Sequence, residues 1–237
     1  MNDPRTKMRE ADARGASAFF GRRKGKQLRS RQAGLMQDFL PRQAVDVTIA
    51  GQNPAQLFNP PASQVQIEIG FGGAEHLIAQ AASNPDIGFI GCEAFVNGIA
   101  KALARIEERE IENIRIFPAD AMELLRVLPE SSISKLFLLY PDPWPKPRQR
   151  KRRIVSKNFL DLAAHVLKPG AQFRFATDID DYAAWTLARI MEHREFVWSP
   201  VTSDDWTRPW QDWTCTRYEA KALREGRVPA YFTFLRR

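Results

Sequence analysis

The sequence predicts an α/β domain in which helices cover both faces of a mostly parallel sheet. Short apolar runs alternate with amphipathic stretches from residue 65 to residue 192, which is typical of right-handed βαβ units. Glycine or acidic residues follow several of the apolar runs, where the chain turns from strand to helix. A length of 237 residues with 44% hydrophobic residues fits one large domain with a substantial core.

The first half of this domain contains three expected strands. VQIEIG (65–70) alternates apolar and polar residues and ends in glycine, and a helix is expected over 74–82. IGFIGCE (87–93) is an apolar run that ends in an acid, as a buried strand does, and residues 95–109 have apolar positions at helical spacing. NIRIF (113–117) is the third strand.

The second half continues the alternation. Residues 120–128 have the pattern of a short helix, and SKLFLLY (134–140) is an apolar fourth strand. A helix over 158–167 is closed by Lys-Pro-Gly, because proline and glycine end helices. AQFRFATD (171–178) is the fifth strand, and a further helix is expected over 181–192.

The two ends of the chain differ in character. FVW (196–198) and AYFTFL (230–235) predict a terminal strand pair. Residues 1–33, rich in Arg, Lys, Gly and Ala with little apolar periodicity, predict a flexible arm. Residues 34–63 form a lead-in segment that ends in a Pro/Asn-rich loop, and 64–237 form the main domain.

The net charge of +7 is unevenly distributed. Residues 1–31 contain ten Lys/Arg against three Asp/Glu, and six further cations fall within 146–153. Two separated basic segments on an otherwise balanced body predict a polyanionic partner, with nucleic acid as the first choice.

Other classes of protein are disfavoured by the composition. Cys92 and Cys215 have no partner spacing, and three histidines stand without a cysteine or carboxylate cluster, so no disulfide framework or metal site is expected. The N-terminus has no apolar signal region, and no run of 18 apolar residues occurs. We therefore expect a cytoplasmic protein without a membrane partner.

The stretch 136–153 (LFLLYPDPWPKPRQRKRR) joins an apolar run to a dense basic run. At the junction, Asp142 lies between prolines and close to Trp144. This layout suits a site that orients a base with its acid while neighbouring cations hold phosphate. The alternative is a buried strand followed by a solvated basic loop.

The turn after the first strand favours a cofactor without phosphate. Gly70 and Gly72 let the backbone turn tightly and approach a ligand. A dinucleotide fingerprint would need a third glycine where Glu75 stands, and Glu75 and Glu68 would both repel a pyrophosphate. S-adenosylmethionine, which has a sulfonium, an ammonium and no phosphate, suits this acidic turn better than NAD does.

Acids at the next two strand ends support the same cofactor. Glu93 closes the second strand, where a carboxylate can accept hydrogen bonds from both ribose hydroxyls. Asp120 follows the third strand and can meet the adenine edge. Taken alone, Asp120 could equally be the N-cap of the helix that follows.

These motifs resemble those of the bacterial tRNA (guanine-N7-)-methyltransferases over most of residues 65–237. The resemblance implies a Rossmann-like class I methyltransferase fold, with a seven-stranded, mostly parallel sheet whose last strand is antiparallel. It also implies S-adenosylmethionine as cofactor and a guanine in the variable loop of tRNA as substrate. The motifs that carry it are PDPWPK (141–146) with KRR (151–153), EIGFG (68–72), GCE (91–93), ADA (119–121), ATD (176–178) and TRYE (216–219).

Site residues follow from the matching positions. Asp142 is the implied catalytic residue. The expected cofactor-binding residues are Glu68, Gly70, Gly72, Glu93, Asp120, Ala121 and Asp142. The expected substrate-binding residues are Lys146, Asp178, Thr216, Arg217, Tyr218 and Glu219, and the expected RNA-binding residues are Arg148, Gln149, Arg150, Lys151, Arg152 and Arg153.

Several positions depart from the family pattern. Ala74 stands where the glycine-rich turn often has a third glycine, and Pro147 where a basic residue is common. Arg217 and Tyr218 replace the usual Lys and Phe, and Ala222 stands where glycine is usual. None of these changes affects the proposed acids, so they bear on turn geometry and on tRNA contacts.

Guanine N7 has an in-plane lone pair, so its methylation needs alignment and no general base. An ionised Asp142 that accepts from guanine N1–H and N2–H would orient the base and stabilise the positive charge that methylation produces. Asp178 could hold a base or a ribose, or cap the helix that starts near Asp180. The tryptophans at 198, 206, 210 and 213 could stack bases, although a small aromatic core is the favoured interpretation.

Three other functions remain open from the sequence. PDPW partly resembles the D-P-P-[YW] signature of exocyclic-amine methyltransferases, an NAD dehydrogenase would require Glu75 to point away from the cofactor, and an RNA-binding protein could keep this fold without turnover. The sequence does not decide between a monomer and a homodimer.

Overall fold

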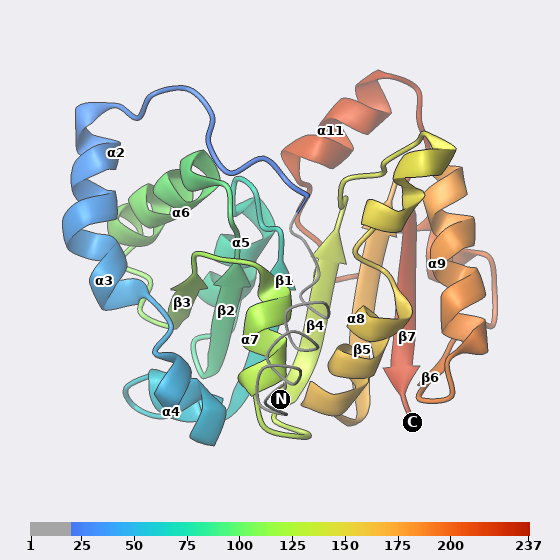
Figure 1. Ribbon diagram of the computed structural model, residues 1–237, viewed down its shortest axis with the longest axis horizontal. Helices are drawn as coiled ribbons and strands as arrows, with labels where there is room; N and C mark the ends of the chain where they lie inside the picture. Colours follow the sequence, from blue (N-terminus) through green and yellow to red (C-terminus); the bar gives the residue numbers. More distant parts are fainter. Residues whose placement is uncertain (1–19) are drawn as a thin grey trace, which may run out of the picture.

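The computed structural model describes residues 20–237, so the first part of the expected arm, residues 1–19, lies outside the described residues. These residues form one seven-stranded sheet of order β3-β2-β1-β4-β5-β7-β6 (Figure 1). β7 pairs antiparallel with both β5 and β6, and the other neighbours are parallel, which confirms the expected sheet. The strands are β1 (Gln64–Ile69), β2 (Ile87–Cys92), β3 (Ile114–Phe117), β4 (Ile133–Leu139), β5 (Leu167–Thr177), β6 (Phe196–Val197) and β7 (Ala230–Arg236).

Helices lie on both faces of this sheet (Figure 1). Among residues 20–237, no helix is long and apolar enough to cross a membrane. The helices before β1 are α2 (Ser30–Gly34), the π-helix η1 (Leu35–Phe39), α3 (Leu40–Gln43), α4 (Val47–Gln52) and the 3-10 helix η2 (Pro54–Leu57). Those after it are α5 (Glu75–Ser83), α6 (Val96–Glu108), α7 (Ala121–Val127), the 3-10 helix η3 (Pro147–Arg152), α8 (Lys157–Val166), α9 (Asp180–Glu192), α10 (Asp204–Thr207) and α11 (Arg217–Arg224).

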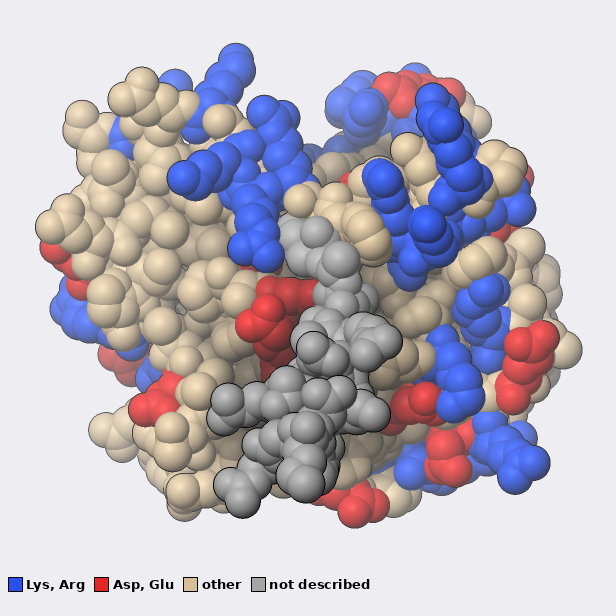
Figure 2. All heavy atoms as spheres, in the orientation of Figure 1, with Lys and Arg blue, Asp and Glu red and all other residues tan. Residues whose placement is uncertain are grey.

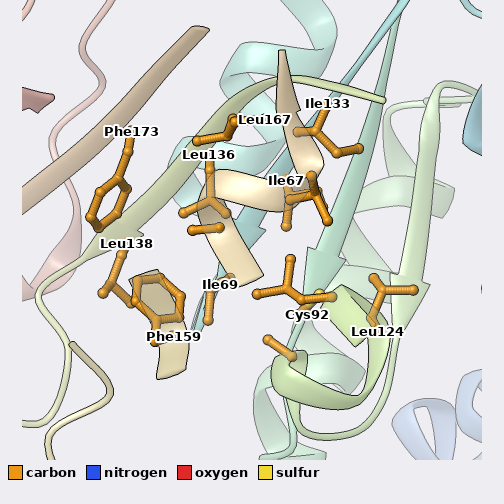
Figure 3. Close-up of a cluster of buried hydrophobic side chains, with 14 of the residues drawn as sticks. Ile67, Ile69, Cys92, Leu124, Ile133, Leu136, Leu138, Phe159, Leu167 and Phe173 are labelled. Carbon is orange, nitrogen blue, oxygen red and sulfur yellow. The ribbon is translucent and has the colours of Figure 1, made fainter. Parts of the chain in front are cut away.

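One face of the sheet packs on α7, α8 and α9 through a large apolar cluster, part of which Figure 3 shows. Side chains alternate along a strand, so Ile67 and Ile69 of β1 point into this cluster. Glu68, between them, is directed to the opposite face, where α5 lies. Each fully buried aliphatic or aromatic side chain here contributes roughly 1.5–3 kcal/mol by leaving water.

The opposite face is covered by α5 and α6. Ile99, Ala102, Leu103 and Ile106 of α6 are fully buried, at the i, i+3, i+4, i+7 spacing of an apolar helix face. With residues of α5, β2, β3 and η1 they form a second apolar cluster. The two clusters fix the sheet between its helices, so the strand ends at one edge are held in place.

The described part of the expected arm, residues 20–33, contacts the main domain. The Val96 amide donates to the Arg23 carbonyl oxygen at 2.9 Å. The Asn97 side chain accepts from the Gly25 amide and donates to the Lys26 carbonyl oxygen, each at 2.7 Å. This segment is therefore attached to the start of α6.

Two further details differ from the pattern in the sequence. The expected Pro/Asn-rich loop before β1 contains η2, which Asn53 begins by accepting from the Ala55 amide at 3.0 Å. β5 starts at Leu167 rather than at 171, because Leu167 already pairs with Ile133 before a register shift in the ladder. Neither detail changes the strand ends at which the site lies.

Candidate active site

A cavity of about 440 Å³ lies beyond the carboxyl ends of β1, β2 and β4. The sheet order places β1 between β2 and β4, so the chain leaves β1 toward one side and returns on the other. Such a switch point is where open α/β sheets bind ligands, and the volume fits a small cofactor. Of the residues expected at the site, those lining the cavity are Gly70, Gly72, Glu93, Asp120, Ala121, Asp142, Lys151, Arg152, Arg153 and Tyr218.

The turn between β1 and α5 has the left-handed conformation that glycine favours. Gly70 has φ +72° and Gly72 has φ +54°. A Cβ on Gly72 would lie 3.1 Å from the Tyr218 ring, and a Cβ on Gly98 of α6 would lie 2.6 Å from the Gly72 carbonyl oxygen. The turn is therefore closely packed on both sides, and only glycine fits there without displacement.

Ala74 also adopts a left-handed conformation, with φ +62°, at the N-cap of α5. An alanine there costs roughly 1–2 kcal/mol relative to glycine. Its side chain is completely buried in the α5–α6 cluster, and burying one methyl group recovers about 0.8 kcal/mol. This burial explains how the turn accepts alanine at a position where glycine is expected.

Glu93 ties the first turn to the end of β2. Its Oε2 accepts from the Gly72 amide at 2.8 Å and its Oε1 from the Phe95 amide at 2.9 Å. Burial raises the pKa of this carboxyl group, and the amide hydrogen bonds oppose that rise. Each carboxylate oxygen can accept a second hydrogen bond, so the ionised group can still receive two hydroxyl donors.

Asp120 serves as a helix cap and also borders the cavity. Its Oδ1 accepts from the Met122 amide at 3.0 Å, which makes it the N-cap of α7 and confirms the capping interpretation. Asp120 and the buried Ala121 both line the cavity as well. The two roles are compatible, because the bond to Met122 occupies one carboxylate oxygen.

Glu68 is not among the residues that line the cavity. Its side chain is buried, and its Oε2 lies 2.7 Å from His76 Nδ1 of α5. The His76 ring packs against Phe137 and Trp213. The structure therefore places Glu68 under the glycine turn, in contact with α5 rather than with the cavity.

Asp142 lies in the loop after β4, at the mouth of the cavity. Tyr140 has φ +50° and Trp144 has φ +42°, so left-handed residues stand on both sides of this acid. Such conformations in residues other than glycine cost about 1–3 kcal/mol each and persist where the surroundings impose them. Asp142 is exposed to solvent on one side, yet the cavity walls desolvate it enough to raise the pKa of its carboxyl group.

The basic run after this loop forms η3, with Pro147 near its start, where proline is well tolerated. Lys146, Arg148 and Lys151 are exposed, and Gln149 is half-buried. Arg150 is also half-buried, and its guanidinium lies 2.8 Å from the Asp181 carboxylate.

The last two arginines of the run are held by the protein. The Arg152 guanidinium lies 4.9 Å from the Trp144 ring centre and 5.2 Å from that of Phe20. Arg153, expected to bind RNA, is buried, and its side chain has no exposed surface. The structure therefore separates Arg153 from the exposed cations.

The segment Thr216–Glu219 begins α11. The Thr216 hydroxyl caps this helix by accepting from the Glu219 amide at 3.2 Å. Arg217 donates to the Glu75 carboxylate of α5 at 2.9 Å, and Tyr218 lines the cavity. Ala222 is buried within the same helix, which continues through that position without a turn.

Two of the acids expected to bind substrate are engaged within the protein, and neither lines the cavity. The Glu219 carboxylate accepts from Trp213 Nε1 at 2.7 Å and from the Tyr231 hydroxyl. The Asp178 carboxylate accepts from Arg227 Nε at 2.6 Å. Asp178 does not cap α9, because the N-cap of that helix is the residue after it.

The four tryptophans form small aromatic cores, which confirms the favoured interpretation. Trp198 and Trp206 pack edge to face and lie against the large apolar cluster. Trp210 and Trp213 pack against each other and against Tyr231.

Figure 2 shows how charge is distributed around the cavity. Lys and Arg side chains gather on two rims, one over the segment before α2 and the other over the part that contains η3 and α11. Acidic side chains lie below the first of these rims, in the region of α7. A cationic, small ligand and a polyanion could therefore bind side by side.

Phe20, Gly21 and Arg22 also line the cavity, which the sequence did not predict. Their contact depends on the fold bringing this segment to α6 over more than 70 residues of chain, and no local pattern encodes it. Tyr140 is a further lining residue that was missed, although its position two residues before Asp142 was a usable signal.

Comparison with known families agrees with this geometry. A family model described as "Putative methyltransferase" matches residues 62–231. A protein named tRNA (guanine-N(7)-)-methyltransferase from Bradyrhizobium diazoefficiens is 52% identical, with 92% of this chain and 93% of that protein covered. Its namesake from Agrobacterium fabrum is 50% identical, with 96% and 99% covered.

Solved structures share the fold at low sequence identity. A mutant of the 16S rRNA (adenine(1408)-N(1))-methyltransferase from Catenulisporales acidiphilia has a TM-score of 0.53 at 13% identity, covering 81% of this chain and 91% of that one. TrmN from Thermus thermophilus has a TM-score of 0.52 at 15% identity, covering 84% and 52%. From the family model and the close relatives, we conclude that the chain belongs to the tRNA (guanine-N7-)-methyltransferase family.

Proposed function

We propose that this protein acts in the cytoplasm and transfers a methyl group from S-adenosylmethionine to N7 of a guanine in the variable loop of tRNA. The observation that carries the proposal is the position of Asp142. This acid stands at the mouth of the cavity and four residues before the first exposed cation of the basic run. One loop thus joins the place where a cofactor fits to the surface that can hold RNA.

The residues around the cavity fit S-adenosylmethionine. Gly70 and Gly72 present backbone without side chains, so a methionine moiety can approach the first turn. Glu93 keeps two acceptor positions for the ribose hydroxyls, and Asp120 with Ala121 borders the part of the cavity suited to adenine. The bound cofactor supplies an electrophilic methyl group.

The protein's task is then to orient the base, because N7 is nucleophilic without losing a proton. An ionised Asp142 can accept from guanine N1–H and N2–H, which fixes N7 relative to the methyl group. It also stabilises the positive charge that the purine gains. Adenine offers no donors in that arrangement, so the same contact favours guanine.

Phosphate contacts are assigned to the exposed cations. Lys146, Arg148 and Lys151 are exposed beside the cavity, and half-buried Arg152 and Gln149 lie among them. Tyr218 lies against the first turn, so it can contact a base that enters the cavity. Arg217 and Thr216 support this tyrosine through Glu75 and the helix cap.

The other expected positions have protein partners, so their roles are assigned indirectly. Glu68, Asp178 and Glu219 each bind a side chain of this chain. We propose that Glu68 supports the cofactor turn from below, and that Asp178 and Glu219 hold the substrate-binding segment.

The direct test is methyl transfer to unmodified tRNA with labelled S-adenosylmethionine, followed by nucleoside analysis and by chemical cleavage at N7-methylguanosine. We expect one labelled N7-methylguanosine in the variable loop. Label in N6-methyladenosine or N4-methylcytidine would instead support an exocyclic-amine enzyme. Tight tRNA binding without label transfer or cofactor binding would support a non-catalytic RNA-binding protein.

A further inference from the structure

Arg153 is the last cation of the basic run, and its side-chain contacts all tie it to the protein. Its Nε donates to the Pro143 carbonyl oxygen at 2.8 Å. One terminal nitrogen donates to the Asp181 carbonyl oxygen at 3.2 Å, and the other forms an ion pair with the Asp181 carboxylate. Arg153 borders the cavity, but its side chain has 0% exposure, so only its backbone reaches the surface and a phosphate cannot reach the guanidinium without local unfolding.

Helix α9 also contributes two aromatic rings that contact the Arg153 side chain. The Arg153 guanidinium lies 4.8 Å from the ring centre of Tyr182 and 5.1 Å from that of Trp185. Trp185 Nε1 in turn donates to the Val155 carbonyl oxygen at 2.9 Å. Planar stacking with a forked hydrogen bond is a geometry that arginine can make and lysine cannot.

The loop that Arg153 contacts can form few backbone hydrogen bonds of its own. In 141–147 every second residue is proline, so four of seven residues have no amide hydrogen to donate. The left-handed residues Tyr140 and Trp144 bound the segment that contains Asp142. A conformation of this kind requires support from outside the loop. Arg153 provides it at Pro143, the residue after Asp142.

We propose that Arg153 is a positioning residue that connects α9 to the Pro143 carbonyl and thereby fixes Asp142, and that it does not contact RNA. This inference rests on the proposed function, in which Asp142 orients guanine. It assigns to one member of the basic run a task different from that of its neighbours.

Three variants separate positioning from RNA contact. Arg153→Lys keeps the charge but loses the fork and the stacking. We expect kcat to fall on the order of 10- to 100-fold, with tRNA affinity and its salt dependence unchanged. Asp181→Asn removes the ion pairs of this half-exposed carboxylate with both Arg153 and Arg150. It should lower kcat in the same direction without weakening tRNA binding, because Arg150 keeps its charge. Arg148→Ala should weaken tRNA binding and reduce the slope of log affinity against log salt by roughly 0.7–0.9.

Arg236→Lys is the matched control. Arg236 is also a mostly buried arginine that donates to a backbone carbonyl, that of Ala164 at 2.8 Å, and pairs with Glu195. It lies on β7 and does not line the cavity. The control should leave both kcat and tRNA affinity unchanged, so that a loss in Arg153→Lys is not a general effect of replacing a buried arginine.

NMR relaxation of backbone amides provides a readout that does not depend on activity. The amide order parameters of Asp142, Trp144 and Lys146 should be lower in Arg153→Lys and Asp181→Asn than in the wild type and the Arg236→Lys control. If Arg153→Lys does not fold, Asp181→Asn decides. Lower order parameters in the Arg153 and Asp181 variants, together with full activity of Asp142→Asn, would support the positioning role and reject the proposed function of Asp142.

Two results would overturn the inference itself. One is a weaker tRNA affinity with a smaller salt slope and a normal kcat in Arg153→Lys. The other is unchanged amide order parameters at residues 142–146 and unchanged kcat in Asp181→Asn.

Discussion

At the scale of single residues, the acids near the cavity differ in what they already bind. Glu93 and Asp120 accept hydrogen bonds from backbone amides and still border the cavity, whereas the Glu68 carboxylate is hydrogen-bonded to His76. Asp142 lines the cavity and is exposed to solvent. Position at a strand end is visible in the sequence, but whether a carboxylate faces the ligand depends on the alternation of side chains along the strand.

The raised pKa of Asp142 predicts a pH dependence of kcat. Only the ionised carboxylate can accept both guanine donors, and its ionised fraction falls as the pH drops through its pKa. Because desolvation raises that pKa, the acidic limb of the kcat profile should lie above the usual aspartate value of about 3.9. Asp142→Asn should remove this limb while lowering kcat.

Glu93 also has a raised pKa, so it could produce an acidic limb of its own. Its titration should appear in the affinity for S-adenosylmethionine, measured by calorimetry across pH, rather than in kcat. A kcat limb that persists unchanged in Asp142→Asn would assign it to another group.

Glu68 offers a separate test at the residue scale. Replacing it by alanine leaves His76 Nδ1 buried without its partner, which should lower the free energy of unfolding by about 1–3 kcal/mol. Cofactor affinity of the folded variant should change much less than in Glu93→Ala. A large loss of affinity with normal denaturation would instead show that Glu68 contacts the cofactor directly.

At the scale of elements, the sheet was predictable because each strand is encoded locally. The apolar runs that become β1, β2, β3 and β4 and the acids at their ends could be identified from pattern alone. The attachment of residues 23–26 to α6 and of Arg153 to α9 could not, because both join segments far apart in the sequence. For the same reason, a run of six cations gave no sign that one of them is buried.

Packing of α6 against the first turn predicts the effect of Gly98→Ala. The added methyl group would lie 2.6 Å from the Gly72 carbonyl oxygen, so the turn must move. We expect affinity for S-adenosylmethionine to fall at least about tenfold, which corresponds to about 1.4 kcal/mol.

Gly34→Ala is the control for this variant. A Cβ at Gly34 meets nothing within 4 Å, and the residue is helical, so cofactor affinity should stay constant. Its free energy of unfolding should rise by about 0.4–1 kcal/mol. Equal cofactor affinity in both variants would show that α6 does not hold the turn.

At the scale of the whole molecule, the two basic rims in Figure 2 predict strongly salt-dependent tRNA binding. Neutralising about six phosphates would reduce affinity roughly 1,000-fold between 50 and 200 mM salt. Replacing both Lys24 and Lys26, which are exposed before α2, by alanine should reduce the slope of log affinity against log salt by roughly 1.4–1.8. Lys168 is also exposed, but it lies at the start of β5, away from the strand ends that border the cavity. Lys168→Ala is therefore the control and should not alter the slope.

Binding that stays flat over this salt range would contradict the assignment of the rims to RNA. A slope that changes in the Lys168 variant and not in the Lys24/Lys26 variant would place the RNA on a different face.

In this account, Asp142 of the PDPWPK loop orients the guanine base. The exposed cations that follow it bind the phosphates of the RNA backbone. The most direct measurement is the single-turnover rate of methyl transfer for Asp142→Asn with saturating S-adenosylmethionine and tRNA, alongside both dissociation constants. We predict a rate lower on the order of 100-fold with both dissociation constants near those of the wild type. A wild-type rate in this variant, with N7-methylguanosine still formed, would contradict the claim.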